Sequence, residues 1–226
     1  MIRVFENSRE LAQGAAEHFV ALAQKDSFGV ALSGGSTPKL LYQLLADQFQ
    51  TQVPWSRTQF FWSDERHVPP DHPDSNYRMA YETLLSRVPV PESNVHRVFG
   101  ENPSAQQAAD EYEKVIVPRL DLILLGLGAD GHTASIFPGS EVLHETKRLV
   151  AAPWVEKLNT YRITMTLPLL NNGASIVFLV SGAEKAQIVK EVLEGPKKYP
   201  AQFVNPTDGE LIWMLDRDAA RNLNRG

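Results

Sequence analysis

The sequence predicts an α/β fold with a mostly parallel central sheet flanked by helices. Two observations predict it: short apolar or β-branched runs alternate with amphipathic stretches, and several of these runs are apolar throughout, as in strands buried on both faces. The 226 residues are 43% hydrophobic and 22% charged, which is typical of a globular protein with a large core. No repeat, low-complexity tract or linker divides the chain, so residues 1–226 are expected to form a single domain.

The expected elements follow from the period of the apolar residues, which is two or continuous in strands and near 3.6 in helices. The expected strands are residues 3–5, 29–33, 59–63, 122–126, 148–152, 162–166, 175–181 and 210–215. The expected helices are residues 8–24, 37–49, 75–85, 104–119, 183–193 and 217–223.

Charge and composition limit the possible partners. The chain has 22 Lys and Arg against 27 Asp and Glu, a formal net charge of -5, so no nucleic-acid partner is expected and any anion must be held by a local site. The absence of cysteine excludes disulfides, thiolate metal sites and cysteine nucleophiles. The chain start does not resemble a signal peptide, and no apolar run approaches the ~20 residues that span a bilayer. We therefore expect a cytoplasmic protein with no membrane partner.

A glycine pair and two hydroxyl residues lie between the strand 29–33 and the next helix, as Gly34, Gly35, Ser36 and Thr37. Glycines let the backbone approach an anion, hydroxyls donate hydrogen bonds, and the N–H groups of a helix start favour negative charge. The pattern predicts a phosphate cradle, although an ordinary strand-to-helix turn with a hydroxyl cap would have the same residues. The G-x-x-x-x-G-K-[ST] spacing of a Walker loop is absent.

Three charged residues, Asp64, Glu65 and Arg66, follow the aromatic strand 59–63. At the carboxyl end of a parallel strand, such charges reach the crevice where open α/β sheets bind ligands. Asp64 is a candidate to take or steer a proton, and Arg66 is a candidate to hold a phosphate or an oxyanion; a solvated turn is the alternative. Residues 74–78 predict a helix N-cap, with Asn76 and Arg78 near the same rim.

The glycines of residues 126–131 spell G-x-G-x-x-G, directly before His132. A dinucleotide site expects this pattern after the first strand, with an acidic residue about 20 positions on. Here the motif lies past mid-chain, the next expected strand carries no carboxylate, and Asp130 would repel a pyrophosphate. Because imidazole titrates near neutral pH, His132 is instead a candidate general acid or base; a capping or packing histidine is the alternative.

The strand 175–181 is followed by a glycine and a helix start that carries Lys185. A cation there opposes the helix dipole, so we expect a compensating anion and interpret Lys185 as a phosphate ligand; an exposed lysine is the alternative. Arg162, at the start of the strand 162–166, is a lesser basic candidate.

Four motifs occur together in one order: SGGSTP at 33–38, DERxVP at 64–69 with SNY at 75–77, GxGxDGHTASxFP at 126–138, and SGxxKA at 181–186. This set resembles the 6-phosphogluconolactonase family, which is related to the glucosamine-6-phosphate isomerase/deaminase enzymes, and the resemblance covers almost the whole chain. It implies a modified Rossmann-like domain without a nucleotide. It also implies hydrolysis of 6-phospho-D-glucono-1,5-lactone to 6-phospho-D-gluconate in the oxidative pentose phosphate pathway.

The resemblance also implies roles for the candidate residues. His132 would activate water and then protonate the leaving ring oxygen, and Asp130 would orient it. Arg66 would stabilise the oxyanion or hold the sugar acid, while Asp64 would order Arg66 or bind sugar hydroxyls. No metal or organic cofactor is expected, and no sequence feature indicates an oligomeric state. The residues assigned to the 6-phosphate are Gly34, Gly35, Ser36, Thr37 and Lys185, with Arg162 as a lesser candidate.

Two alternatives come from the same resemblance. The deaminase pattern continues G-H-I-A-F-N-E-P, but here Phe137 occupies the glutamate position and cannot transfer a proton. A non-catalytic sugar-phosphate sensor would carry a DNA-binding module, and we expect none because the predicted elements run from residue 3 to residue 223. A degenerate lactonase that only binds sugar phosphates stays an alternative.

Overall fold

The computed structural model describes residues 1–224, which form two sheets around one hydrophobic core. The larger sheet is parallel throughout, in the order β1-β10-β9-β5-β2-β3, which confirms the predicted fold class. Its inner strands β2 and β9 are buried at every residue, as strands of a doubly covered parallel sheet must be. Its strands are β1 (Ile2–Phe5), β2 (Phe28–Leu32), β3 (Thr58–Trp62), β5 (Leu122–Leu125), β9 (Ser175–Val180) and β10 (Glu210–Asp216).

The smaller sheet is antiparallel, and the sequence does not predict it as a separate unit. It contains β4 (Asp64–Arg66), β8 (Thr160–Met165) and β6 (Val150–Ala151) in that order, and β7 (Trp154–Val155) also pairs with β8. The charged triplet 64–66 is therefore a strand, which corrects the alternative of a solvated turn. Because its partner strand lies far along the chain, no local pattern could show this pairing.

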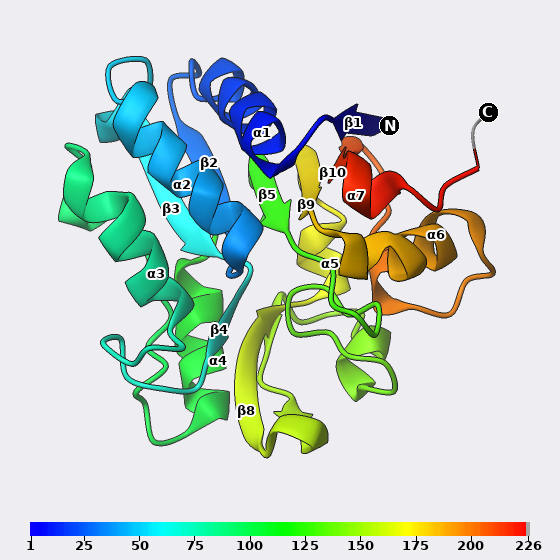
Figure 1. The fold of residues 1–226 in the computed structure, drawn as a ribbon. Coiled ribbons are helices and arrows are strands. Elements are labelled where there is room, and N and C mark those ends of the chain that lie inside the picture. The colour runs from blue at the N-terminus through cyan, green and yellow to red at the C-terminus, as the bar shows by residue number, and fades with distance from the viewer. Residues whose placement is uncertain (225–226) are drawn as a thin grey trace.

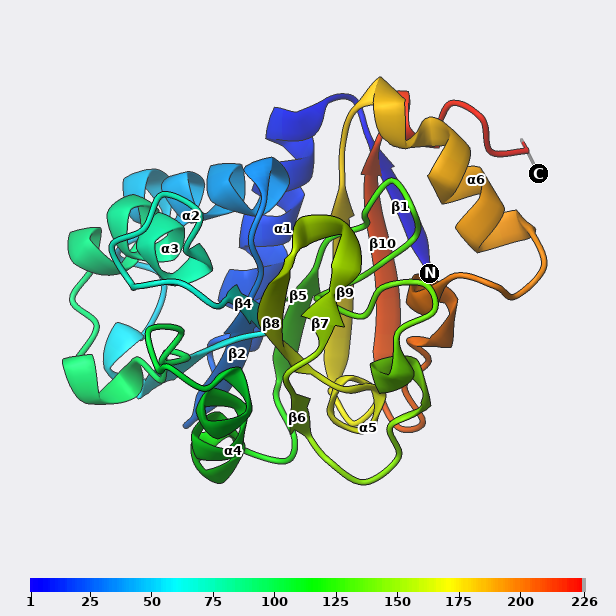
Figure 2. The same cartoon turned by 90° about the horizontal axis from the view of Figure 1, so that it is seen from below.

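Seven α-helices cover the sheets within the described residues. Figure 1 shows α1 and α2 on one side of the large sheet, with the small sheet and α4 on the other. Figure 2, seen from below, shows β8 in front of β5 and β9. Among residues 1–224, none of the helices has the length and apolar character needed to cross a membrane. The helices are α1 (Ser8–Leu22), α2 (Ser36–Gln48), α3 (Asn76–Thr83), α4 (Ala105–Val115), α5 (Leu167–Leu170), α6 (Ala186–Glu194) and α7 (Arg217–Ala220).

Local chemistry explains most helix ends. Ser75 caps α3 by accepting a hydrogen bond from the backbone N–H of Arg78, as the sequence predicts. The helix predicted at 104–119 ends at Val115, because Ile116 is extended and Pro118 restricts the residue before it. The helix predicted from residue 183 begins with a 3-10 turn, Ala183–Lys185, before α6. The short helix α5 is absent from the sequence-based prediction.

The strand order decides where a ligand can bind. The strands β5 and β2 are neighbours, but the chain leaves them in opposite directions along the strand order. From β2 it continues to β3 at one edge of the sheet, whereas from β5 it continues, through the small sheet, to β9 toward the other edge. Such a reversal separates the loops that leave two neighbouring strands and opens a crevice at their carboxyl ends. Because β2, β5 and β9 are adjacent, the segments that begin at residues 33, 126 and 181 meet at this crevice.

Candidate active site

A cavity of about 490 Å³ opens at the carboxyl ends of β2, β5 and β9. It brings residues of all four sequence motifs together, and of the residues given a catalytic or binding role from the sequence only Asp130 is not part of its wall. Arg78 is also outside the wall, because its guanidinium bonds to Glu82 and to the carbonyl of Asp71. The predicted site residues in the wall are Gly34, Gly35, Ser36, Thr37, Asp64, Arg66, His132, Arg162 and Lys185.

The phosphate cradle predicted at residues 34–37 forms the start of α2. Gly35 is the N-cap and has φ +109°, a conformation that L side chains rarely adopt. A Cβ on Gly34 would lie 2.0 Å from Oδ1 of Asn76, so glycine is also required for close packing there. The Thr37 hydroxyl lies 2.8 Å from that of Ser181, which ties the loop after β2 to the loop after β9.

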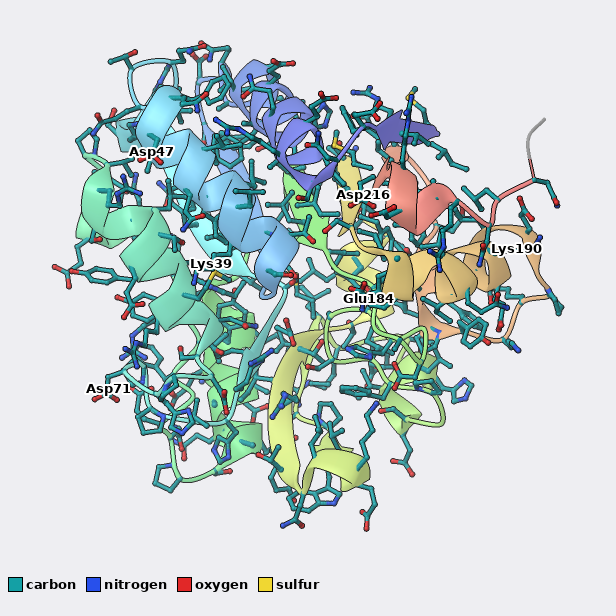
Figure 3. The ribbon with its side chains drawn as sticks, in the orientation of Figure 1. Lys39, Asp47, Asp71, Glu184, Lys190 and Asp216 are labelled. Atoms are coloured by element: carbon teal, nitrogen blue, oxygen red, sulfur yellow. The ribbon has the colours of Figure 1, made fainter. Side chains whose placement is uncertain are left out.

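Lys185 reaches the cavity from the loop after β9. Its Nζ donates a 2.8 Å hydrogen bond to the carbonyl of Leu127, in the loop after β5. Gly182 begins this turn with φ +103°, and its N–H donates to the carboxylate of Asp216 at 3.1 Å. Figure 3 shows Glu184 at the start of α6, near the centre of the molecule, and Asp216 beside α7. Glu184 also lines the cavity, so the cradle contains one carboxylate as well as its cation.

His132 is held by the carboxylate of Asp130. Nδ1 of His132 lies 2.5 Å from Oδ1 of Asp130, and the His132 backbone N–H donates to the same oxygen at 3.2 Å. A Cβ on Gly128 would lie 2.0 Å from Nδ1, so this glycine makes room for the ring. The ring of Phe137 packs against the imidazole with centroids 4.2 Å apart. The loop therefore fixes the imidazole from three sides.

The charge of Asp130 is stabilised by two partners. Burial acts to raise the pKa of Asp130, but hydrogen bonds from Lys157 and His132 outweigh it and hold the pKa well below its usual value. Asp130 is therefore ionised at neutral pH and can accept a proton from Nδ1 of His132. Among the described residues, Nε2 of His132 has no hydrogen-bond partner, which leaves it as the nitrogen that can exchange a proton.

Asp64 is buried at the cavity wall, with 7% of its surface exposed. Oδ2 accepts a 2.6 Å hydrogen bond from the Ser135 hydroxyl, and Oδ1 accepts one from the Asn76 amide at 3.2 Å. Within residues 1–224, Asp64 makes no hydrogen bond to Arg66, whose guanidinium donates to the carbonyl of Asp74 at 2.7 Å. The carboxylate of Asp64 is bonded to Ser135 and Asn76, so the structure gives no contact, within the residues it describes, through which Asp64 would order Arg66. The alternative, that Asp64 binds sugar hydroxyls, stays a prediction.

Arg66 and Arg162 lie directly opposite each other on β4 and β8, so their side chains share one face of the small sheet. Burial lowers the pKa of Arg162, and the positive charge of Arg66 lowers it further. Two guanidinium groups placed together in this way favour an anion between them. Within the described residues, the wall contains four cations, Arg66, Lys157, Arg162 and Lys185, and two carboxylates, Asp64 and Glu184, so the cavity is positive although the whole chain is acidic.

Several residues that shape the site are not identified from the sequence. Lys157 lines the cavity and pairs with Asp130, yet no local pattern marks it. Asn76, which the sequence places near the rim of the site, does line the cavity, but its contact with Asp64 is visible only in the structure. Glu65 is 2% exposed and accepts hydrogen bonds from the backbone N–H groups of Asn76 and Tyr77, which anchors the start of α3 beside the site.

In the part of the chain that the structure describes, no group of three or more His, Asp or Glu side chains is placed to hold a metal ion. The expectation that no metal or organic cofactor takes part stays a prediction.

The fold and cavity define an α/β protein that binds its ligand at the carboxyl edge of a parallel sheet. Residues 6–213 match the family model of glucosamine-6-phosphate isomerases/6-phosphogluconolactonase, and the chain belongs to this family. It is 44% identical over 216 residues to a 6-phosphogluconolactonase of Synechocystis, covering 90% of this chain and 88% of the relative.

Solved structures agree with this assignment. The 6-phosphogluconolactonase of Trypanosoma brucei is 31% identical with a TM-score of 0.87, over 99% of this chain and 98% of the other. A monomeric glucosamine-6-phosphate deaminase also reaches a TM-score of 0.87, over 98% and 99% of the two chains, but at 21% identity. That last likeness shows the fold alone, so the fold does not separate the two activities of the family.

Proposed function

We propose that this protein hydrolyses 6-phospho-D-glucono-1,5-lactone to 6-phospho-D-gluconate in the oxidative pentose phosphate pathway, with His132 as the general base. The observation that carries the proposal is the Asp130–His132 pair in one cavity with the glycine and hydroxyl cradle. Relatives that match over most of the chain are named 6-phosphogluconolactonase, and the chain is accordingly a lactone-hydrolysing carboxylic ester hydrolase.

The cradle binds the end of the substrate that does not react. The 6-phosphate lies against the start of α2, where the N–H groups and the hydroxyls of Ser36 and Thr37 donate to it and Lys185 supplies a positive charge. Anchoring the phosphate there places the lactone carbonyl further along the cavity, toward His132. Arg162 lies with Arg66 on the small sheet, so we assign it to the sugar acid rather than to the phosphate.

The reaction is one addition and one elimination. Nε2 of His132 takes a proton from water, whose oxygen adds to the lactone carbonyl carbon, and Asp130 stabilises the imidazolium that forms. Arg66, with Arg162 beside it, stabilises the negative charge on the carbonyl oxygen. The bond from this carbon to the ring oxygen then breaks, and the imidazolium returns its proton to that oxygen. Asp64 keeps acceptor capacity for a sugar hydroxyl.

The contact between Phe137 and His132 disfavours the deaminase activity. The resemblance places a working glutamate at residue 137, but here an aromatic ring lies 4.2 Å from the imidazole centroid. The ring can restrict His132 but cannot carry a proton. No other described side chain supplies a carboxylate to His132 except Asp130, which accepts from Nδ1.

Replacement of His132 by alanine tests the proposal. Loss of the general base lowers kcat by about 10²–10⁴-fold. The assay follows freshly generated 6-phosphogluconolactone, with correction for spontaneous hydrolysis. His67→Ala is the matched control, since His67 belongs to a neighbouring motif but bonds to the carbonyl of Asn102 and does not line the cavity. Near-wild-type turnover by His132→Ala removes this histidine from the role.

The same assay separates an enzyme from a binding protein. A non-catalytic sugar-phosphate binder retains affinity for 6-phosphogluconate but gives no protein-dependent loss of lactone. We also propose that residues 1–226 act as one catalytic domain and that it works in the cytoplasm, because a phosphorylated substrate does not cross a bilayer unaided. Cell fractionation tests the location.

A further inference from the structure

His132 and three neighbouring side chains form a closed arrangement. The imidazole bonds to Asp130, Asp130 accepts a hydrogen bond from Nζ of Lys157, and that Nζ lies 4.5 Å above the ring centroid of Phe137. Phe137 in turn packs against the imidazole at 4.2 Å. Three of the four belong to the segment after β5, and Lys157 alone comes from the turn between β7 and β8.

The pair between Lys157 and Asp130 has little to do with the stability of the fold. The lysine side chain is 52% exposed and the aspartate side chain is 34% exposed, and ion pairs this accessible contribute little because water screens them. The geometry has a more direct consequence for the imidazole. Oδ2 of Asp130 accepts a hydrogen bond from Lys157, and Oδ1 is bonded to His132. The lysine therefore restricts the orientation of the carboxylate, and the carboxylate in turn restricts the orientation of the imidazole ring.

We propose that Lys157 is a positioning residue for the reaction: it holds Asp130 in the orientation that keeps the Nδ1 proton of His132 in place and Nε2 available, and its charge offsets that of Asp130. This inference rests on the proposed function of His132 as the base. Lys157 acts through Asp130 and does not need to touch the substrate.

The sign of the electrostatic effect follows from the two charges. Asp130 favours the protonated form of the imidazole, whereas the positive charge of Lys157 disfavours it. When only the lysine is replaced, the backbone N–H of His132 still holds the Asp130 carboxylate beside the ring. The carboxylate then lacks its opposing cation, so His132 stays protonated up to a higher pH and less of the base is available in mildly acidic solution. The other groups that face the ring or its loop are the same in such a variant; they are Asp64, Arg66, Arg162, Glu184, Lys185 and Tyr199.

The test compares Lys157→Met with Lys157→Arg and with a matched lysine elsewhere. Lys198 is the matched control, because it is 57% exposed, lies 3.4 Å from the carboxylate of Glu191 and lies 4.6 Å above the Tyr199 ring, but does not line the cavity. For each variant, kcat/KM is measured against pH with correction for spontaneous hydrolysis. The titration of the His132 ring is followed by nitrogen NMR without substrate, with the signals identified from His132→Gln.

We expect Lys157→Met to move the acid limb of kcat/KM and the midpoint of the His132 titration upward by about half to one pH unit. Activity then falls about three- to tenfold on the acid side of the limb and less at higher pH. Lys157→Arg and Lys198→Met leave both midpoints near the wild-type values. Lys157→Gln, which keeps the stem but not the charge, gives the same shift and replaces the methionine variant if that one fails to fold.

Two results overturn the proposal. In the first, Lys157→Met leaves the His132 titration unchanged or moves it downward. In the second, KM rises while the pH profile stays the same, which makes Lys157 a substrate ligand instead. Because the ring titration needs no substrate, it tests the positioning role even if the protein proves to have no lactonase activity.

Discussion

The two sides of the cavity present different chemical groups and belong to different sheets. On the cradle side, residues 34–37 and the turn Ala183–Lys185 present main chain, hydroxyls and one lysine from segments that directly follow strands of the large sheet. On the arginine side, Arg66 and Arg162 come from the small antiparallel sheet. In the mechanism that we propose, the first side binds the phosphate with groups fixed by local backbone geometry, and the second places long cationic side chains at the reacting end of the substrate. The difference predicts that cradle variants change binding and that arginine variants change turnover.

Arg66→Met should cause the largest loss of activity on either side of the cavity. Loss of a charged donor to the oxyanion lowers kcat by about 10²–10³-fold, with a smaller change in KM. Steady-state kinetics on the lactone measure both. Arg78→Met is the matched control, because that guanidinium is bonded to Glu82 and to Asp71 away from the cavity, and it should stay within about twofold of wild type. If Arg66→Met raised KM and left kcat unchanged, Arg66 would contribute to substrate binding, as the cradle residues are expected to do, and the proposed difference between the two sides would be wrong.

Gly128→Ala tests whether the loop after β5, which carries His132, can be altered without changing phosphate binding. A Cβ at this position would lie 2.0 Å from Nδ1 of His132, so the ring must move, and kcat should fall by about 10²-fold, as expected for a displacement near 1 Å. Binding of inorganic phosphate, measured by calorimetry, should be unchanged because the cradle does not contact this Cβ. Gly139→Ala is a control from the same segment, because a Cβ there would have no atom within 4 Å. Its φ of +77° makes that substitution strained, so it also tests whether backbone strain without a clash lowers kcat. Weak phosphate binding in Gly128→Ala would show that the two regions are coupled.

Lys185→Met tests the cradle itself. Loss of a charged hydrogen bond to the phosphate costs about 1.5–3 kcal/mol, or about 10- to 150-fold in KM, with a smaller effect on kcat. Lys39→Met is the control, since Lys39 lies close to the cradle in sequence, on α2, where Figure 3 labels it, but does not belong to the cavity wall. If kcat fell and KM did not, Lys185 would belong with the reacting end.

The smallest expected effect is the contribution of Asp130 to the free energy of unfolding and its dependence on pH. The folded-state pKa of this carboxyl lies below the ordinary value, so its contribution to stability is present above about pH 4 and is lost as the pH falls through the lowered pKa. Because a third of the side chain is exposed, the contribution should stay below about 1 kcal/mol. Urea unfolding of wild type and Asp130→Asn from pH 2 to pH 7 measures it. A difference that grew toward acid pH would contradict this sign.

Much of the fold is predictable because its signals are local. Strands such as β2 and β9, which are buried at every residue, are almost entirely apolar in sequence. The start of α3 is marked by Ser75, whose side chain accepts a hydrogen bond from the backbone N–H three residues later. Two of the differences from the prediction have clear physical reasons. The short strand β4 forms only because β8 pairs with it, and the helix after residue 104 ends early because Ile116 and Pro118 stop it.

The sequence by itself determined the groups that single segments carry: the cradle at 34–37, Lys185 after its glycine, and His132 two residues after Asp130. Each is a property of a few adjacent residues whose backbone conformation and spacing are fixed locally. Only the tertiary structure decided which of them share a cavity and what lies opposite. The pairing of β4 with β8 places Arg66 beside Arg162, and the β7–β8 turn brings Lys157 to Asp130. These contacts join distant segments, so they depend on the packing of the whole chain.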